Sequence, residues 1–135
     1  MTRSRRVRWA LFTVAVVANL VLLYWPRAVG TGGVPHLDKL GHALSFGLVM
    51  WAGAWAGLAV RGLVVVLAAH AVTSESVQHW LLERRSGDPA DVLADLVGVA
   101  GVVLALGTAS WRHEHGGQHQ RGADGEAARG HPRPG

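Results

Sequence analysis

The chain has 135 residues, of which 50% are hydrophobic and 16% charged, with a formal net charge of +4 and no cysteine. Soluble domains of this size carry about 25% charged residues, so much of this chain is predicted not to face water. The absence of cysteine excludes a disulfide scaffold, a thiolate zinc site and a cysteine nucleophile.

Four apolar blocks follow one another along the chain, and a helix needs about 20 residues to span the hydrocarbon core of a bilayer. The first block, residues 9–25, has 17 residues without a charge, and the second, residues 40–60, has 21. The third, residues 62–82, contains three ionisable residues, and the fourth, residues 90–111, has two aspartates near its start. The sequence therefore predicts an all-α protein in which residues 9–111 form a bundle of four transmembrane helices.

The first block has a second interpretation, a cleaved signal peptide, because Ala28-Val29-Gly30 is similar to a small-residue cleavage site. Its apolar stretch is longer than the ~7–15 residues of a signal core. Tyr24-Trp25 is typical of an interfacial aromatic belt. We therefore expect an uncleaved membrane anchor that follows a basic N-terminal segment, residues 1–8.

The distribution of arginine and lysine predicts the orientation of the helices, because cytoplasmic loops carry an excess of these residues. With the N-terminus inside, nine of the thirteen fall on the cytoplasmic side and four on the outer side. We expect both termini in the cytoplasm, a multi-pass protein of the cell membrane, and a tight hairpin at Arg61-Gly62 between the second and third helices. The basic residues lie at the borders of apolar segments, so nucleic acid is not an expected partner.

Residues 112–135 are rich in Gly, His, Gln and Arg and show no apolar period. Such a composition cannot bury enough surface to offset the entropy of ordering, so we expect a disordered cytoplasmic tail. His113, His115 and His119 could bind a transition metal weakly, but a solvated tail is the simpler interpretation.

Two small-residue spacings, Gly53-x-x-x-Gly57 and Ala94-x-x-x-Gly98, permit close approach of helices. Packing within the bundle is the simpler interpretation of both spacings. Contact between two copies of the chain, which would form a homo-oligomer, is the alternative.

Ionisable residues inside a span are rare and usually face a bundle interior or a water-filled cavity. Helical spacing puts polar residues on one face of each of three helices. These faces hold Asp38, His42, Ser45 and Val49 in the second helix, Glu75, Gln78 and Leu82 in the third, and Asp88, Asp91, Asp95 and Gly98 in the fourth. With a rise of about 1.5 Å per residue, His42, Glu75 and Asp95 lie about 10 Å below the outer ends of their helices. The sequence therefore predicts one polar cluster near the extracytoplasmic face, to which the first helix contributes Asn19.

Several of these residues also have structural alternatives. Asp88 followed by Pro89 is typical of a helix N-cap, and Asp91 is placed to support the first helical turn. Asp95 lies too deep for capping. Buried structural pairing or interfacial anchoring is the alternative for the remaining ionisable residues, Lys39, His42, Glu75, Arg84 and Arg85.

The motifs Asp38-Lys39-x-x-His42, Glu75-x-x-Gln78, Arg85 and Asp91-x-x-x-Asp95-x-x-Gly98-x-x-Gly101 follow one another within residues 38–101. This order resembles the VanZ-like family of small bacterial membrane proteins, which are described as four-helix proteins. The family is named for a member associated with resistance to a glycopeptide antibiotic. The resemblance implies a bacterial protein that acts at the cell envelope. Two positions depart from the family pattern, because Phe46 stands where a tyrosine is common and Asp95 where the family has Asn or Asp.

Two functional hypotheses follow from the predicted cluster. In the first, Lys39 and Arg85 hold an anionic headgroup of a membrane lipid or a lipid-linked envelope component, because the guanidinium fork suits such groups. The expected binding residues are Asp38, Lys39, Gln78, Arg85 and Asp91. In the second, the protein is an enzyme acting on a lipid-linked substrate, with Glu75 or His42 as general base beside Asp95.

Ion conduction is a weaker hypothesis, because the polar groups occupy one half of the spans and His70 is the only deeper ionisable candidate. His42, Glu75 and Asp95 are permissible metal ligands. The two-histidine spacing typical of zinc sites is absent, so the sequence predicts neither a metal nor another cofactor.

Overall fold

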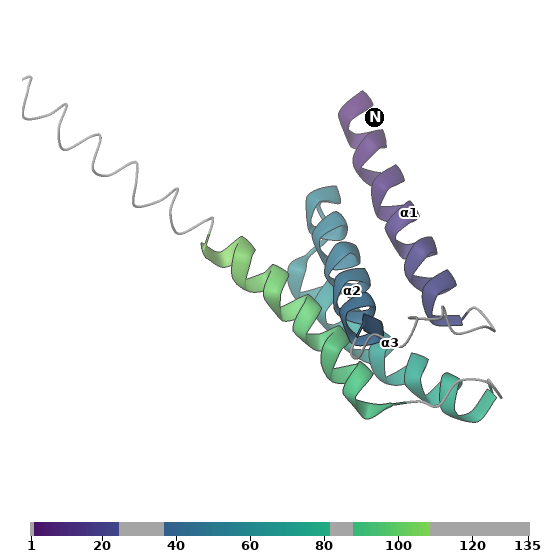
Figure 1. Cartoon of the computed structure of the whole chain (residues 1–135). Helices are drawn as coiled ribbons and strands as arrows, with labels where there is room; N and C mark the ends of the chain where they lie inside the picture. The colour runs from purple at the N-terminus through teal and green to yellow at the C-terminus, as the bar shows by residue number, and fades with distance from the viewer. Residues whose placement is uncertain (1, 25–36, 82–87, 109–135) are drawn as a thin grey trace, which may run out of the picture. The chain divides into compact units, whose positions relative to one another are not determined.

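The computed structural model describes residues 2–24, 37–81 and 88–108. This part of the chain is all-helical, with α1 (Arg3–Tyr24), α2 (Leu37–Ala56), α3 (Val60–Leu81) and a fourth helix over Pro89–Thr108 (Figure 1). The chain divides into two units at Val103, and the polar residues discussed below belong to the first. The predicted tail, residues 112–135, lies outside the described residues.

Three of the helices, α1, α3 and the fourth, are long and apolar enough to cross a membrane. Large side chains such as Val65 and Val97 are about two-thirds exposed on these helices, as expected where a helix surface contacts lipid. α2 is not among these three helices, and its first turns hold Asp38, Lys39 and His42. It buries seven residues against its neighbours, whereas α1 buries three. Its other face is apolar and exposed at Leu40, Leu44 and Leu48, so α2 is not enclosed by protein.

α1 begins well before the first apolar block. The backbone carbonyl of Thr2 accepts hydrogen bonds from the N–H groups of Arg5 and Arg6 at 3.0 and 3.3 Å, which opens the helix at Arg3. Arginine is a good helix former, so the basic segment continues the helix without a break. Most of residues 1–8 therefore belong to the same helix as the apolar block.

α2 ends in a Schellman motif at Gly57, which has a φ of 94°. The N–H of Leu58 donates to the Gly53 carbonyl and that of Gly57 to the Ala54 carbonyl, each at 3.0 Å. Glycine adopts positive φ without a steric penalty, and this places the turn at residues 57–59. The predicted hairpin position at Arg61-Gly62 is therefore wrong, because both residues lie in the first turn of α3.

Of the two glycines in the predicted Gly53-x-x-x-Gly57 packing contact, only Gly53 lies at a helix interface. A Cβ added at Gly57 would meet nothing within 4 Å, so this glycine serves the turn and not the helix interface. A Cβ added at Gly53 would lie 2.9 Å from Leu63 and 3.1 Å from Phe12. Gly53 therefore does permit close packing, against side chains of α3 and α1.

α2 and the fourth helix meet backbone to backbone at Gly98. A Cβ added there would overlap the carbonyl oxygen of Ala43 and lie 2.8 Å from its carbonyl carbon. The predicted small-residue spacing that includes Gly98 is thus used inside the bundle. His42 is adjacent to Ala43, and Asp95 lies about one turn before Gly98, so this contact sets the two side chains opposite each other.

Candidate functional site

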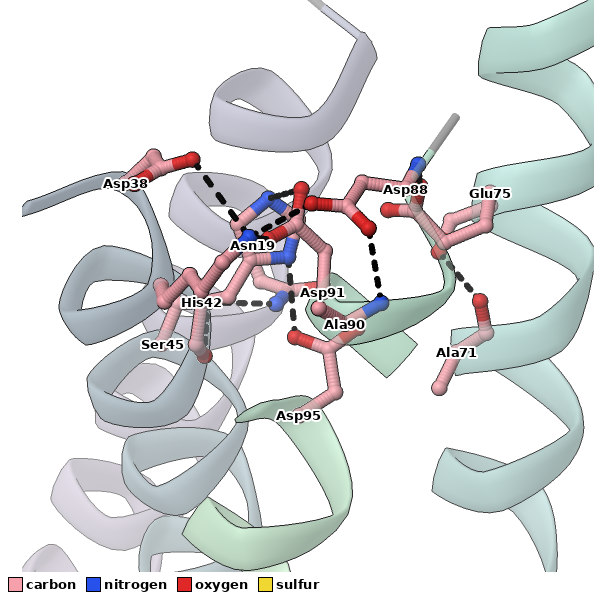
Figure 2. A network of polar contacts seen from close by, with 12 residues as sticks. Asn19, Asp38, His42, Ser45, Ala71, Glu75, Asp88, Ala90, Asp91 and Asp95 are labelled. Carbon is pink, nitrogen blue, oxygen red and sulfur yellow. Dashed lines mark hydrogen bonds and ion pairs between the residues drawn. The ribbon is translucent and has the colours of Figure 1, made fainter. Parts of the chain in front are cut away.

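The centre of the site is a hydrogen-bonded pair between α2 and the fourth helix (Figure 2). His42 Nδ1 donates to Asp95 Oδ1 at 3.0 Å, and the side chains are 9% and 0% exposed. The other ring nitrogen, Nε2, lies 3.9 Å from Asp91 Oδ2. The Asp95 carboxylate therefore fixes the orientation of the imidazole so that its second nitrogen faces Asp91.

Lys39 ties α2 to the first turn of the fourth helix. Its Nζ donates to Asp88 Oδ2 at 2.7 Å and to Asp91 Oδ1 at 2.8 Å. The hydrogen bond from Lys39 lowers the pKa of the Asp88 carboxyl, and a hydrogen bond from the backbone N–H of Ala90 lowers it further. Asp38, a predicted binding residue, is half exposed and lies 3.8 Å from Lys39 at the edge of this network.

Asp88 caps the fourth helix, as the sequence predicts. Its Oδ1 accepts the N–H of Ala90 at 2.9 Å, and its carbonyl accepts the N–H of Asp91 at 2.8 Å. Glu75 of α3 reaches the same helix start, where its Oε2 accepts the N–H of Asp88 at 2.9 Å. The partial positive charge of a helix N-terminus favours a carboxylate at this position. The first turn of the fourth helix therefore binds both Lys39 of α2 and Glu75 of α3.

His42, Glu75 and Asp95 come from three different helices, and each offers one ligand atom within 4.8 Å of the other two. Their predicted meeting is confirmed, while their chemical roles stay predictions. We call these three residues together with Lys39, Asp88 and Asp91 the polar cluster.

Several buried atoms in and beside the polar cluster have no hydrogen-bond partner among the described residues. They are Glu75 Oε1, Asp95 Oδ2 and Gln78 Nε2, in residues that are 7%, 0% and 3% exposed. An unpaired buried polar atom costs about 1–3 kcal/mol, so native proteins rarely keep one without a reason. The site therefore retains two acceptors and one donor for a proton, an ion or a ligand.

A pocket of about 430 Å³ lies between α3 and the fourth helix. Its lining residues are Val72, Glu75, Ser76, His79, Trp80, Pro89 and Val92. Glu75 is the member of the polar cluster among them. The pocket thus offers a route to the cluster from the side of the bundle.

A second polar chain joins α1 to α2 and α3, and the sequence indicates only part of it. Asn19 Nδ2 donates to Ser45 Oγ at 3.1 Å, and Ser45 Oγ donates to the carbonyl of His42 at 3.0 Å. His70 Nε2 donates to Asn19 Oδ1 at 3.1 Å, and its ring stacks on Phe46 with centroids 5.5 Å apart. His70 is therefore a bundle contact, which its isolated position in the sequence did not indicate.

Arg85, a predicted binding residue, lies outside the described residues, as does the neighbouring Arg84. Comparisons with protein-family models, curated proteins and solved structures found no match. The resemblance to the VanZ-like family, and the envelope role that it implies, stay predictions.

Proposed function

We propose that this protein is a multi-pass protein of the cell membrane that binds an anionic component of the cell envelope at the polar cluster. In this proposal all four helices span the membrane, both termini are cytoplasmic, and the cluster opens toward the extracytoplasmic side. The observation that carries it is Gln78 Nε2, a buried donor without a hydrogen-bond partner among the described residues, one turn along α3 from Glu75 of the polar cluster. An oxygen of a bound anionic headgroup offers a reason for keeping this donor.

The location of the cluster supports this proposal. Ionisable residues inside membrane spans usually mark a substrate or ion site. The pocket beside Glu75 has about the volume of a small-molecule site, and its apolar lining residues, such as Trp80 and Val92, suit the hydrocarbon part of a lipid.

The positive charge for an anion would come from Lys39 and from the segment before the fourth helix. Lys39 already contacts two carboxylates, so its charge is offset in the free protein. Arg85 stands three residues before Asp88 in the sequence, which is close enough for its side chain to reach the start of the fourth helix. A guanidinium there would bind a phosphate or carboxylate through two parallel hydrogen bonds.

An enzyme acting on a lipid-linked substrate is the second candidate function. It is favoured by one observation, the buried His42–Asp95 hydrogen bond with the Glu75 carboxylate nearby. A carboxylate that orients an imidazole, next to a second carboxylate, is an arrangement suited to proton transfer. Glu75→Gln separates the two functions, because it keeps the shape and removes the base. An enzyme would lose turnover of the lipid-linked substrate in this variant, whereas a binding protein shows no turnover to lose.

Headgroup binding can be tested through Trp80, which lines the pocket and is 79% exposed. The full-length protein in neutral detergent is titrated with short-chain phosphatidylglycerol and, separately, with short-chain phosphatidylcholine, and tryptophan fluorescence is recorded. We expect a saturable change with the anionic lipid alone, which Trp80→Phe removes. Lys39→Met should weaken binding at least ~10-fold, since it removes a charge that a headgroup would contact.

The matched control is Arg61→Met, which removes an exposed cation at the opposite end of α3. It should leave the affinity unchanged. Equal responses to the two lipids, or equal weakening by Lys39→Met and Arg61→Met, would reject the proposal, because surface charge alone would then explain the binding.

A further inference from the structure

We propose that His42, Glu75 and Asp95 form a binding site for one divalent transition-metal cation. One imidazole nitrogen and two carboxylate oxygens are ligand types that zinc and its neighbours accept. Ligand atoms on one zinc ion each lie about 2.0–2.2 Å from the metal, so they are about 3–4 Å from one another. The three ligand atoms already lie within 4.8 Å of one another, and small side-chain movements complete the site.

The net negative charge of the polar cluster favours the binding of a cation. Its carboxylates belong to Glu75, Asp88, Asp91 and Asp95, and its basic groups to Lys39 and His42. Four carboxylates against one ammonium leave a formal charge of about −3, or about −2 with a charged imidazole. Asp88 is half exposed, but Glu75, Asp91 and Asp95 are buried, and buried charge of one sign is unfavourable in a bundle surrounded by lipid. A divalent cation would offset most of this excess.

The unpartnered atoms are an independent observation that points to the same ligand. Glu75 and Asp95 are 7% and 0% exposed, and each has one oxygen that accepts a hydrogen bond from the protein. The second oxygen of each, Glu75 Oε1 and Asp95 Oδ2, has no hydrogen-bond partner among the described residues. These two unpaired carboxylate oxygens are available as metal ligands. The hydrogen bonds that Glu75 and Asp95 already accept hold the two side chains in position.

This inference deepens the proposed function and rests on it for its biological role. Three protein ligands leave at least one coordination position for water or for a headgroup oxygen. The cation would then supply the positive charge that an anionic headgroup requires and that Lys39, held between Asp88 and Asp91, does not supply alone. The pocket beside Glu75 would be the entry path.

The test is zinc binding by the full-length protein, purified with a tag that contains no histidine and treated with EDTA. Isothermal titration with Zn²⁺ in detergent should give one equivalent per chain. His42→Gln, Glu75→Gln and Asp95→Asn should each weaken the affinity at least ~10-fold. Co²⁺ added to the unmodified protein should give visible absorption bands of a low-coordinate site, a readout that does not depend on any variant folding.

Two control variants distinguish zinc binding at His42, Glu75 and Asp95 from zinc binding at other histidines. His70→Gln removes a histidine of α3 that hydrogen-bonds Asn19 and is not one of the three ligands, and it should leave the zinc affinity unchanged. A triple substitution of the tail, at His113, His115 and His119, should also leave one equivalent bound. Absence of stoichiometric zinc binding, or binding that the tail variant abolishes, would overturn the metal site. The two carboxylates and the imidazole would then be held together by shared protons.

The lipid titration repeated with and without Zn²⁺ distinguishes failure of the metal site from failure of the proposed function. Phosphatidylglycerol binding that needs Zn²⁺ supports both. Equal lipid binding without metal overturns the metal's role in the site and leaves the proposed function standing. Stoichiometric zinc at His42, Glu75 and Asp95 without any response to the anionic lipid supports the metal site and rejects the headgroup proposal.

Discussion

The contact between Gly98 and Ala43 offers the sharpest test of how the site is assembled. Gly98→Ala adds one methyl group where the fourth helix meets α2. The new Cβ would overlap the Ala43 carbonyl oxygen and lie 2.8 and 3.0 Å from its carbonyl carbon and Cα. These are backbone atoms that cannot rotate away, so the two helices must separate. Gly101, on the same helix, has nothing within 4 Å of an added Cβ and provides the matched control.

The size of the effect follows from two opposing contributions. Overpacking a close contact costs about 1–3 kcal/mol. Alanine in place of glycine inside a helix gains up to about 1 kcal/mol from backbone entropy. Both variants receive this gain, so their difference isolates the contact. We expect Gly98→Ala to be less stable than Gly101→Ala by about 1–3 kcal/mol, with Gly101→Ala equal to the parent protein or slightly more stable.

The assay is unfolding in mixed micelles with increasing SDS, followed by far-ultraviolet circular dichroism. Zinc affinity measured on the same samples reports on the site, because helix separation lengthens the 3.0 Å bond between His42 and Asp95 one turn away. Gly98→Ala should unfold at a lower SDS fraction and bind zinc more weakly than Gly101→Ala. Unfolding of the two variants at the same SDS fraction would show that the backbone contact does not hold these helices in place.

Four further predictions concern topology, the site and the surrounding bundle. In this cysteine-free chain, Thr31→Cys and Gly87→Cys should react with an impermeant thiol reagent from outside, whereas labelling of Gln118→Cys in intact cells would reject the topology. Arg85→Lys should reduce phosphatidylglycerol binding nearly as much as Arg85→Ala, because an ammonium lacks the planar fork; full rescue by lysine would show that charge alone is needed. Asn19→Ala removes the hydrogen-bond partner of His70 and should lower the free energy of unfolding by about 1–3 kcal/mol. The control is Thr13→Ala, at an exposed position of the same helix, which should cause no comparable loss of stability. Because the pKa of Asp88 is lowered, its pairing with Lys39 stabilises the fold above the carboxyl's ordinary pKa of 3.8 and is lost as pH falls through the lowered value. Lowering the pH from about 5 should therefore reduce the stability of the parent protein in SDS more than that of Lys39→Met. Parallel curves of stability against pH for the two proteins would contradict the pairing of Asp88 with Lys39.

The meeting of His42, Glu75 and Asp95 could be predicted from the sequence because helix geometry is regular. A fixed rise and a fixed period assign each residue a depth and a face once the apolar blocks are recognised. The Asp88 cap was predictable for the same reason, since its partner Ala90 is two residues away. Local rules therefore determined which residues gather near one end of the helices and in what order.

Only the tertiary structure decided how each helix is rotated about its axis and which neighbour it meets. The chain from Ser45 through Asn19 to His70 depends on α1 lying beside both α2 and α3. Likewise, the sequence did not indicate that Lys39 lies between the carboxylates of Asp88 and Asp91. The physical reason is that these pairings depend on interhelical distance and rotation, which are set by contacts such as Gly98 on Ala43. Such contacts join residues far apart in the chain, and no periodicity within one helix encodes them.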